Sequence, residues 1–353
     1  MAVQAAAGKG PLIPDIKGMT EMLTKSLSES KDAKVPFAKL QKVLEEDGKA
    51  TADLEYMLSL VRALADVAGK AEARGLSAGD LKLLDKAISE EIVELAKPVL
   101  PRSGSPYHQA MQWVGGTDRD WPVEIFTTNY DMLAEQALEE TGVPYFDGFV
   151  GANKPFFDIR AIEDDALPSR WARLWKLHGS ITWSRSKSGQ VIRQFDATHD
   201  ERRLIHPSHL KYDESRRMPY LALHDRLRQL LRQPNVVIVS CGYSFRDEHL
   251  NEILQEGLQR NPGAIVYGCL YGSLSQYDEA CKLSLRANNA NLVLLAEDEA
   301  VIGCERDGWA GVADPDNDPE LPGVQVEGNK LLCKLGDFAV FGGMLANLAG
   351  TAP

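Results

Sequence analysis

The stretch Val123-Glu124-Ile125-Phe126-Thr127-Thr128-Asn129-Tyr130-Asp131 passes from an apolar run into small polar residues. A helical pattern begins directly afterwards with Met132 and Leu133. This order is typical of a buried strand that delivers polar side chains to its carboxyl end, and ligands bind at that edge of an open α/β sheet. The alternative is that Asn129 or Asp131 only caps the helix. The stretch by itself leaves both interpretations open.

The rest of the sequence repeats this order of strand and helix. Apolar runs lie at 123–126, 174–177, 236–241, 264–270 and 292–296, and helical patterns lie at 131–140, 219–232, 247–258 and 275–287. Strands that alternate with helices predict right-handed crossovers and a mostly parallel sheet. Because the strands are continuously apolar, we expect both faces of the sheet to be covered. The sequence therefore predicts a Rossmann-like α/β domain.

Apolar residues at helical spacing dominate the region before this alternation. One stripe runs from Leu54 to Ala68 and a second from Leu81 to Leu95. The pattern Ser77-x-x-Asp80 before the second stripe predicts a capping box. We predict an all-helical insertion at 35–112, within a Rossmann-like domain formed by 1–34 and 113–353.

The composition restricts the class of protein. With 353 residues, 25% of them charged and 44% hydrophobic, the sequence is typical of a globular protein. A formal net charge of -12 does not favour a polyanionic partner, so the sequence carries no strong nucleic-acid signature. The five cysteines form no C-x-x-C pair, which favours a reducing compartment and argues against structural zinc. With no apolar run of about 18 residues and no signal peptide, we expect a cytoplasmic protein.

Polar clusters follow three of the predicted strands. They are 127–131, Leu177-His178-Gly179-Ser180, and the segment from Ser240 to His249. Because the carboxyl ends of parallel strands meet at one edge of a sheet, we expect the three clusters to gather there. Each cluster also has a structural alternative. His178 would be a hydrogen-bonded core residue, and Ser244-x-x-Asp247 would be a capping box.

The turn Gly242-Tyr243-Ser244 lies at a strand-to-helix junction. A glycine there is explained structurally by close approach of the backbone. The turn also offers free amides and a hydroxyl at a helix N-terminus, an arrangement that suits phosphate or ribose oxygens.

Three ordered motifs resemble the sirtuin-like (Sir2-like) domains of bacterial antiphage defence proteins of the NAD-hydrolysing type. They are Thr127-Thr128-Asn129-Tyr130-Asp131, Lys176-Leu177-His178-Gly179-Ser180 and Gly242-Tyr243-Ser244-Phe245-x-Asp247-Glu248-His249. The flanking motifs Pro106-Tyr107-His108 and Pro207-Ser208-x-x-Lys211-Tyr212 are similar too, and the resemblance extends over about residues 8–345.

The resemblance implies a Rossmann-type site with NAD⁺ as the substrate. It implies that Asn129 and His178 lie at the bond between nicotinamide and ribose, and that Asp131 supports them as a third catalytic residue. The residues that we assign to cofactor binding on the same basis are Thr128, Gly179, Gly242, Tyr243, Ser244 and Asp247.

The sequence departs from the sirtuin pattern in two places. Protein-deacylating sirtuins carry a zinc ribbon with paired cysteines after the His-Gly motif, whereas residues 181–204 contain no cysteine and 184–189 resemble a turn. We therefore expect no zinc, and hydrolysis of NAD⁺ rather than lysine deacylation. The family also opens with an apolar strand and Gly-Ala-Gly-x-Ser, whereas this sequence begins Met-Ala-Val-Gln-Ala-Ala-Ala-Gly. Two explanations remain open: either the start of the sequence is truncated, or this version binds NAD⁺ with a reduced cradle for the pyrophosphate.

The hypothesis is hydrolysis of NAD⁺ to nicotinamide and ADP-ribose by the effector of an antiphage system. His178 would act as the general base, since the ordinary pKa of histidine lies near neutral pH. Asn129 would orient ribose and water, and Asp131 would hold the local geometry. The alternatives are a non-catalytic subunit that binds NAD or ADP-ribose, a structural subunit, and a protein deacylase.

A defence NADase must be silent until it is triggered, so we expect regulation through assembly. The resemblance implies a homo-oligomer with a separate partner, either an ATPase of the hexameric translocase type or a nuclease. The helical insertion would serve as packing surface or lid. The structural alternative is that it only covers one face of the sheet.

Overall fold

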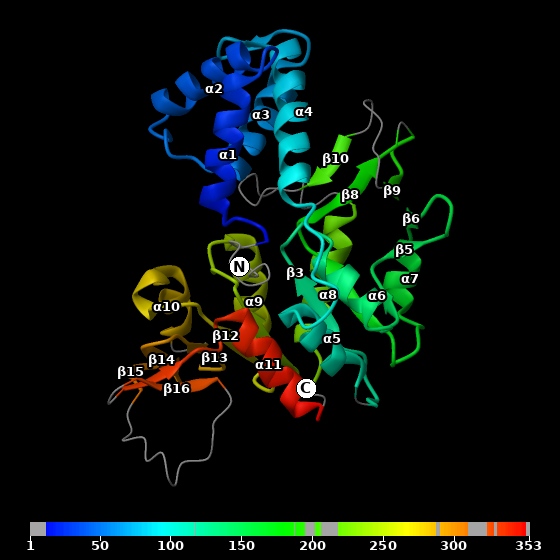
Figure 1. The fold of residues 1–353 in the computed structure, drawn as a ribbon, viewed down its shortest axis with the longest axis vertical. Coiled ribbons are helices and arrows are strands. Elements are labelled where there is room, and N and C mark those ends of the chain that lie inside the picture. Colours follow the sequence, from blue (N-terminus) through cyan, green and yellow to red (C-terminus); the bar gives the residue numbers. More distant parts are fainter. Residues whose placement is uncertain are drawn as a thin grey trace.

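The computed structural model describes residues 12–116, 118–186, 188–194, 202–205, 218–286, 290–309, 323–327 and 330–350. The first residues (1–11) and the motif at 207–212 lie outside this part of the chain. Figure 1 shows helices gathered at one end of the molecule and sheets with flanking helices over the rest.

Four helices form a helical block at the top of Figure 1: α1 (Ile16–Glu29), α2 (Lys34–Glu46), α3 (Leu54–Ala68) and α4 (Ala78–Leu95). The short strands β1 (Glu72–Ala73) and β2 (Leu76–Ser77) pair between α3 and α4. The helices share one core, which contains the fully buried Leu23, Leu40, Leu58 and Leu84. The capping box predicted at Ser77 and Asp80 is confirmed at the start of α4.

Helix α5 (Pro106–Gly115) belongs to another core. It packs with α6 (Leu133–Glu140) around Met111 and Leu138, and it also contacts α11 (Phe338–Leu348). Helix α1 shares the core of α2 to α4. Along the chain after α4, Ala96 still belongs to that core, whereas Leu100 belongs to the core of α5 and α6. The bounds of an insertion at 35–112 stay a prediction.

All five predicted strands are present: β3 (Glu124–Thr127), β7 (Ala172–Lys176), β11 (Val237–Cys241), β12 (Ile265–Cys269) and β13 (Leu292–Leu295). Strand β7 pairs in parallel with β3 on one side and with β4 (Tyr145–Phe146) on the other. Strand β12 pairs in parallel with β11 and β13. Antiparallel β14 (Glu299–Ile302) and β15 (Glu305–Gly308) extend that second sheet.

The sequence predicted one parallel sheet, whereas in the described residues the parallel strands lie in two sheets. Within the described residues, no strand pairs with the free edge of β3 or with the free edge of β11. On β11, Val237 and Val239 remain 57% and 46% exposed. The two sheets still share one core, in which Trp175 lies with Val266 and Leu292. The prediction of a single sheet is wrong because apolar runs mark strands without specifying their neighbours.

An antiparallel sheet, which the sequence did not predict, contains the strand that follows the His178 motif. Its strands, in spatial order, are β10 (Arg202–Ile205), β8 (Gly179–Arg185), β9 (Val191–Arg193), β6 (Phe156–Phe157) and β5 (Phe149–Val150). The turn predicted near 184–189 joins β8 to β9, and there the Gly189 amide donates to the Ser186 carbonyl at 2.9 Å. Strands of two to four residues are too short to show a period of two, which is why the sequence did not reveal most of them.

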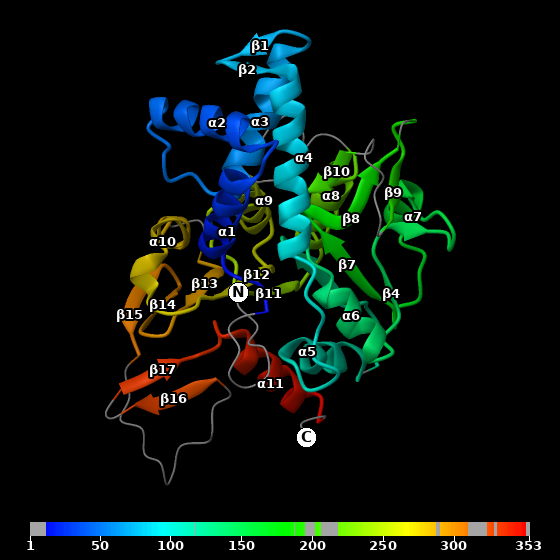
Figure 2. The same cartoon turned by 45° about the horizontal axis from the view of Figure 1, so that its top comes forward.

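Helices cover both faces of the β3–β7–β4 sheet, as predicted. Helices α8 (Tyr220–Leu231) and α9 (Glu248–Arg260) pack on the face of Phe126 and Trp175, and α5 and α6 pack on the face of Ile125 and Leu174. The remaining elements are α7 (Ile159–Asp164), η1 (Leu274–Gln276), α10 (Asp278–Ser284), β16 (Val324–Glu327) and β17 (Lys330–Cys333). Figure 2 shows α10 beside β13 to β15, with β16 and β17 at the opposite end of the molecule from the helical block.

In the part of the chain that the structure describes, every helix is too short or too polar to cross a membrane.

The contact between α5 and α11 gives a test of the packing. A Cβ added to Gly342 would meet the Pro106 carbonyl oxygen at 2.6 Å, whereas one added to the neighbouring Gly343 would meet nothing within 4 Å. We expect Gly342→Ala to lower the free energy of unfolding by about 1–3 kcal/mol, because backbone must shift to admit the methyl group. Gly343→Ala is the matched control and should raise it by about 0.5–1 kcal/mol. Urea unfolding measures the free energy of unfolding of both variants, and an equal change in the two would contradict this packing.

Candidate functional site

Two neighbouring turns carry Asn129 and His178. The Leu177 amide donates to the Thr127 carbonyl at 2.8 Å, and the Ile181 amide donates to the Tyr130 carbonyl at 3.0 Å. These two hydrogen bonds hold the turn after β3 against the turn after β7. The predicted convergence of these two clusters is therefore confirmed at the backbone.

Asn129 is exposed, and its amide donates to Thr127 Oγ1 at 3.0 Å. Its side chain lies near the hydroxyl of Tyr107 on α5, and the Tyr107 ring packs edge-on against Phe338 at 4.8 Å. Burial, together with the nearby charge of Asp131, raises the pKa of Tyr107. In the sequence analysis Tyr107 is only part of a flanking motif and has no predicted role.

Asp131 is buried, and its Oδ1 accepts a hydrogen bond from the Leu133 amide at 2.9 Å. Asp131 thus satisfies a free amide at the start of α6, although the N-cap position of this helix is Met132 rather than Asn129 or Asp131. Its catalytic role stays a prediction. Thr128 beside this turn is half-buried.

His178 joins the first sheet to the second. Its Nε2 lies 2.9 Å from Oδ2 of Asp247, and both side chains are buried. Burial alone would raise the pKa of Asp247, but the hydrogen bond and charge of His178 and the Leu250 amide lower it to about 2. Asp247 is therefore ionised at neutral pH and pairs with the imidazole.

The capping box predicted for Ser244 and Asp247 is wrong in its residues. The N-cap of α9 is Asp247 itself, whose Oδ1 accepts from the Leu250 amide at 3.1 Å. Ser244 lies three residues before the cap, because Phe245 at a φ of 55° turns the chain before the helix begins. A sequence pattern locates such a cap only to within a few residues.

The turn after β11 has exposed residues and one residue whose side chain points inward. Gly242, at a φ of 77°, and Ser244 are exposed. Tyr243 turns inward, where its hydroxyl donates to Asn251 Oδ1 at 2.8 Å and its ring lies 4.6 Å from that of Phe245. Gly242 and Ser244 are therefore free to contact a ligand, whereas Tyr243 serves the packing.

Gly179 has a φ of 86° and is buried beside His178. A residue with a side chain rarely adopts this backbone conformation, so glycine allows β8 to begin directly after the histidine.

Comparison with known families matches residues 123–291 to the model described as the SIR2-like domain. The match supports a Sir2-like domain. It starts one residue before β3 and contains both Asn129 and His178, together with Asp247. The family is associated with NAD-dependent chemistry, which agrees with the cofactor that the sequence implied. No curated protein is similar enough to this chain to match it.

His224 lies within the region that matches the SIR2-like model, and the sequence analysis did not single it out. It lies on the buried face of α8, its ring is 4.9 Å from that of His249, and neither nitrogen has a hydrogen-bond partner among the described residues. Burial, with smaller effects from the charges of His249 and His178, lowers the pKa of His224 to about 3. Nothing in the local sequence distinguishes it from other helix residues.

Two cavities, of about 400 and 470 Å³, open at the other end of β3 and β7. They are lined by residues such as Arg119, Trp121 and Arg170, and they contain none of the predicted site residues. Ligands of open α/β sheets bind at the carboxyl ends of the strands, so we place the site at Asn129 and His178. Among the described residues, no group of three or more His, Cys, Asp or Glu side chains could hold a metal ion.

The buried neutral state of His224 predicts a pH-dependent stability. Its folded pKa of about 3 lies below the ordinary value of 6.5, so the unfolded chain binds the proton more readily between these two values. Stability should therefore fall as the pH drops below 6.5, by about 2 kcal/mol between pH 7 and pH 5. Urea unfolding at both pH values, with His224→Leu as the comparison, measures this. If the variant shows the same decline, His224 is not its source.

Proposed function

We propose that this protein hydrolyses NAD⁺ to nicotinamide and ADP-ribose. The observation that supports this most strongly is the pairing of His178 with the ionised Asp247, beside a turn that presents the exposed Asn129. A histidine held by a carboxylate can accept a proton, and a neighbouring amide can orient a polar substrate group.

The reaction breaks the bond between the ribose carbon and the nicotinamide nitrogen. Nicotinamide leaves as a neutral molecule, and the ribose takes up the positive charge with oxocarbenium character. Water then attacks this carbon and loses one proton, which His178 accepts. The net reaction consumes NAD⁺ and water and yields nicotinamide, ADP-ribose and one proton.

Besides His178, five of the predicted residues have a part in this proposal. Asn129 orients the ribose and the attacking water, and Asp131 holds the turn through its contact with α6. The exposed Gly242 and Ser244 face the ribose and phosphate oxygens. Asp247, which the sequence placed among the cofactor-binding residues, instead orients His178 and stabilises its protonated form.

We further propose that the protein is an antiphage effector that acts as a homo-oligomer, with a partner ATPase or nuclease. This role rests on the motif resemblance. One contact supports control through the helical block: Tyr130, next to Asn129, and Ile181, near His178, pack into the core of α1 to α4. A shift of the helical block on assembly would therefore move both turns.

Asn129→Ala and His178→Ala should each reduce nicotinamide release by at least about 100-fold, because one loses the orienting amide and the other loses the base. Asn347→Ala, an exposed residue of α11, is the control and should keep wild-type turnover. The assay follows nicotinamide by chromatography, and calorimetry with NAD⁺ and ADP-ribose separates a binder from an enzyme. Unchanged turnover in either site variant would remove the mechanism.

Asp247→Asn tests the support of His178. Asparagine caps a helix about as well as aspartate, so α9 should remain intact. The carboxylate that stabilises the imidazolium is lost, and we expect kcat to fall by about 100-fold or more. Turnover is measured together with the thermal midpoint of unfolding. A folded variant with full kcat would show that Asp247 serves only the helix.

A further inference from the structure

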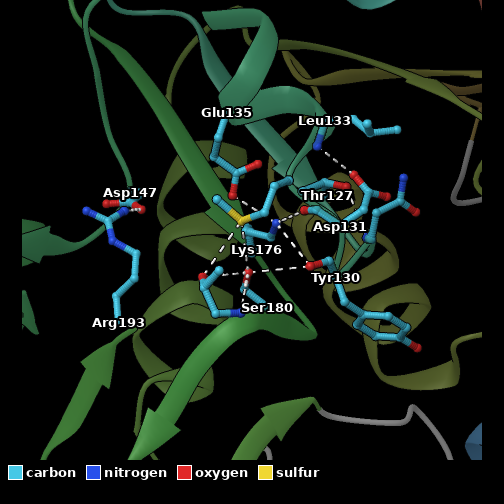
Figure 3. Close-up of polar contacts among 12 residues, drawn as sticks. Thr127, Tyr130, Asp131, Leu133, Glu135, Asp147, Lys176, Ser180 and Arg193 are labelled. Carbon is cyan, nitrogen blue, oxygen red and sulfur yellow. Dashed lines mark hydrogen bonds and ion pairs between the residues drawn. The ribbon is translucent and has the colours of Figure 1, made fainter. Parts of the chain in front are cut away.

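Lys176 and Glu135 form an ion pair inside the protein. Their exposed fractions are 1% and 2%, and Lys176 Nζ lies 2.9 Å from Glu135 Oε1. Lys176 ends β7, two residues before His178, and Glu135 lies in the first turn of α6. Figure 3 shows the lysine ammonium group at the centre of a set of oxygen atoms that come from separate parts of the chain.

The other hydrogen bonds of Lys176 go to the turn that carries Asn129. Nζ donates to the Asp131 carbonyl and, at 3.4 Å, to the Tyr130 carbonyl. With Glu135, these acceptors account for all three donors of the ammonium group. Tyr130 O also accepts from the Ile181 amide at 3.0 Å and from Ser180 Oγ at 3.4 Å. One buried cation therefore connects the strand that leads to His178 with the backbone next to Asn129.

Stability alone does not explain the presence of two charges here. A buried ion pair is often no more stabilising than apolar side chains of the same volume, because both charges lose their hydration. Burial, opposed by Lys176, raises the pKa of Glu135, and its Oε2 has no partner among the described residues. What an apolar pair would not supply is a donor for the two carbonyls of the turn.

We propose that Lys176 is a positioning residue that holds the Asn129 turn in register with His178, and that Glu135 keeps Lys176 in place for this role. The inference rests on the proposed NAD⁺ hydrolysis for its kinetic consequences. Lys176 does not touch the substrate, because its Nζ is enclosed by the turn and by α6. It acts through the placement of the Asn129 amide.

The test compares a single and a double variant. Lys176→Met removes the donors and leaves Glu135 buried without its cation, so both stability and kcat should fall. Lys176→Met/Glu135→Leu removes both charges and should regain most of the stability. In the double variant we still expect kcat to be about 100-fold below wild type, with KM for NAD⁺ changed by less than about 3-fold. The reason is that a misplaced Asn129 amide stabilises the transition state less.

Hydrogen exchange gives a readout that does not need activity. The amides of Asn129 and Leu133 are hydrogen-bonded within the turn, to Thr127 Oγ1 and Asp131 Oδ1. In the double variant they should exchange at least about 10-fold faster than in wild type, while core amides of β12 stay protected. If wild type releases no nicotinamide, the proposed function fails, and this exchange measurement still decides the role of Lys176.

Two further variants complete the design. Arg62→Met/Asp85→Leu removes a second pair with a buried arginine, 2.8 Å apart in the helical block, and should leave kcat within about 2-fold of wild type. Glu135→Gln keeps an oxygen for Nζ and leaves both carbonyl contacts of Lys176, so kcat should stay within about 3-fold. The proposal is overturned by a folded double variant with wild-type kcat and exchange, or by Glu135→Gln losing activity with the turn still protected.

Discussion

The candidate site depends on the contact between two turns at the carboxyl ends of β3 and β7. Backbone hydrogen bonds join Leu177 to Thr127 and Ile181 to Tyr130, so Asn129 and His178 sit on adjoining segments although 49 positions separate them in the sequence. Parallel pairing of β3 with β7 sets this arrangement, because it places both strand ends at one edge. The roles proposed for Asn129 and His178 follow from this contact.

The connection to the second sheet is made by side chains rather than by a shared strand. Among the described strands none lies between β3 and β11, so the pair His178 and Asp247 crosses from one sheet to the other. The common hydrophobic core beneath it keeps the two sheets in place. This arrangement makes the His178 environment sensitive to how α9 begins, since Asp247 both caps the helix and accepts from the imidazole.

Buried charges in the region of residues 123–291 are mostly paired, and the pairs hold the strands of the site. Arg226 on α8 reaches Glu124 at 3.0 Å and Asp165 at 2.9 Å, and Glu124 also accepts from the Trp175 indole at 2.7 Å. Such groups are tolerated in a core when their partners satisfy them. His224 is the contrasting case: it has no such partner within the described part of the chain, and burial keeps it neutral.

The sequence by itself determined the positions of the main strands and helices, the three polar clusters and the Sir2-like motifs. These are local properties, since a run of apolar residues or a helical period is complete within a few turns of chain. Tertiary structure alone decided that the strands form two sheets, that Asp247 serves His178, and that Lys176 pairs with Glu135 across 41 positions. It also decided the burial of His224 and the contact of Tyr107 with Asn129. Pairing and burial depend on which distant segments meet, and a local pattern carries no information about that choice.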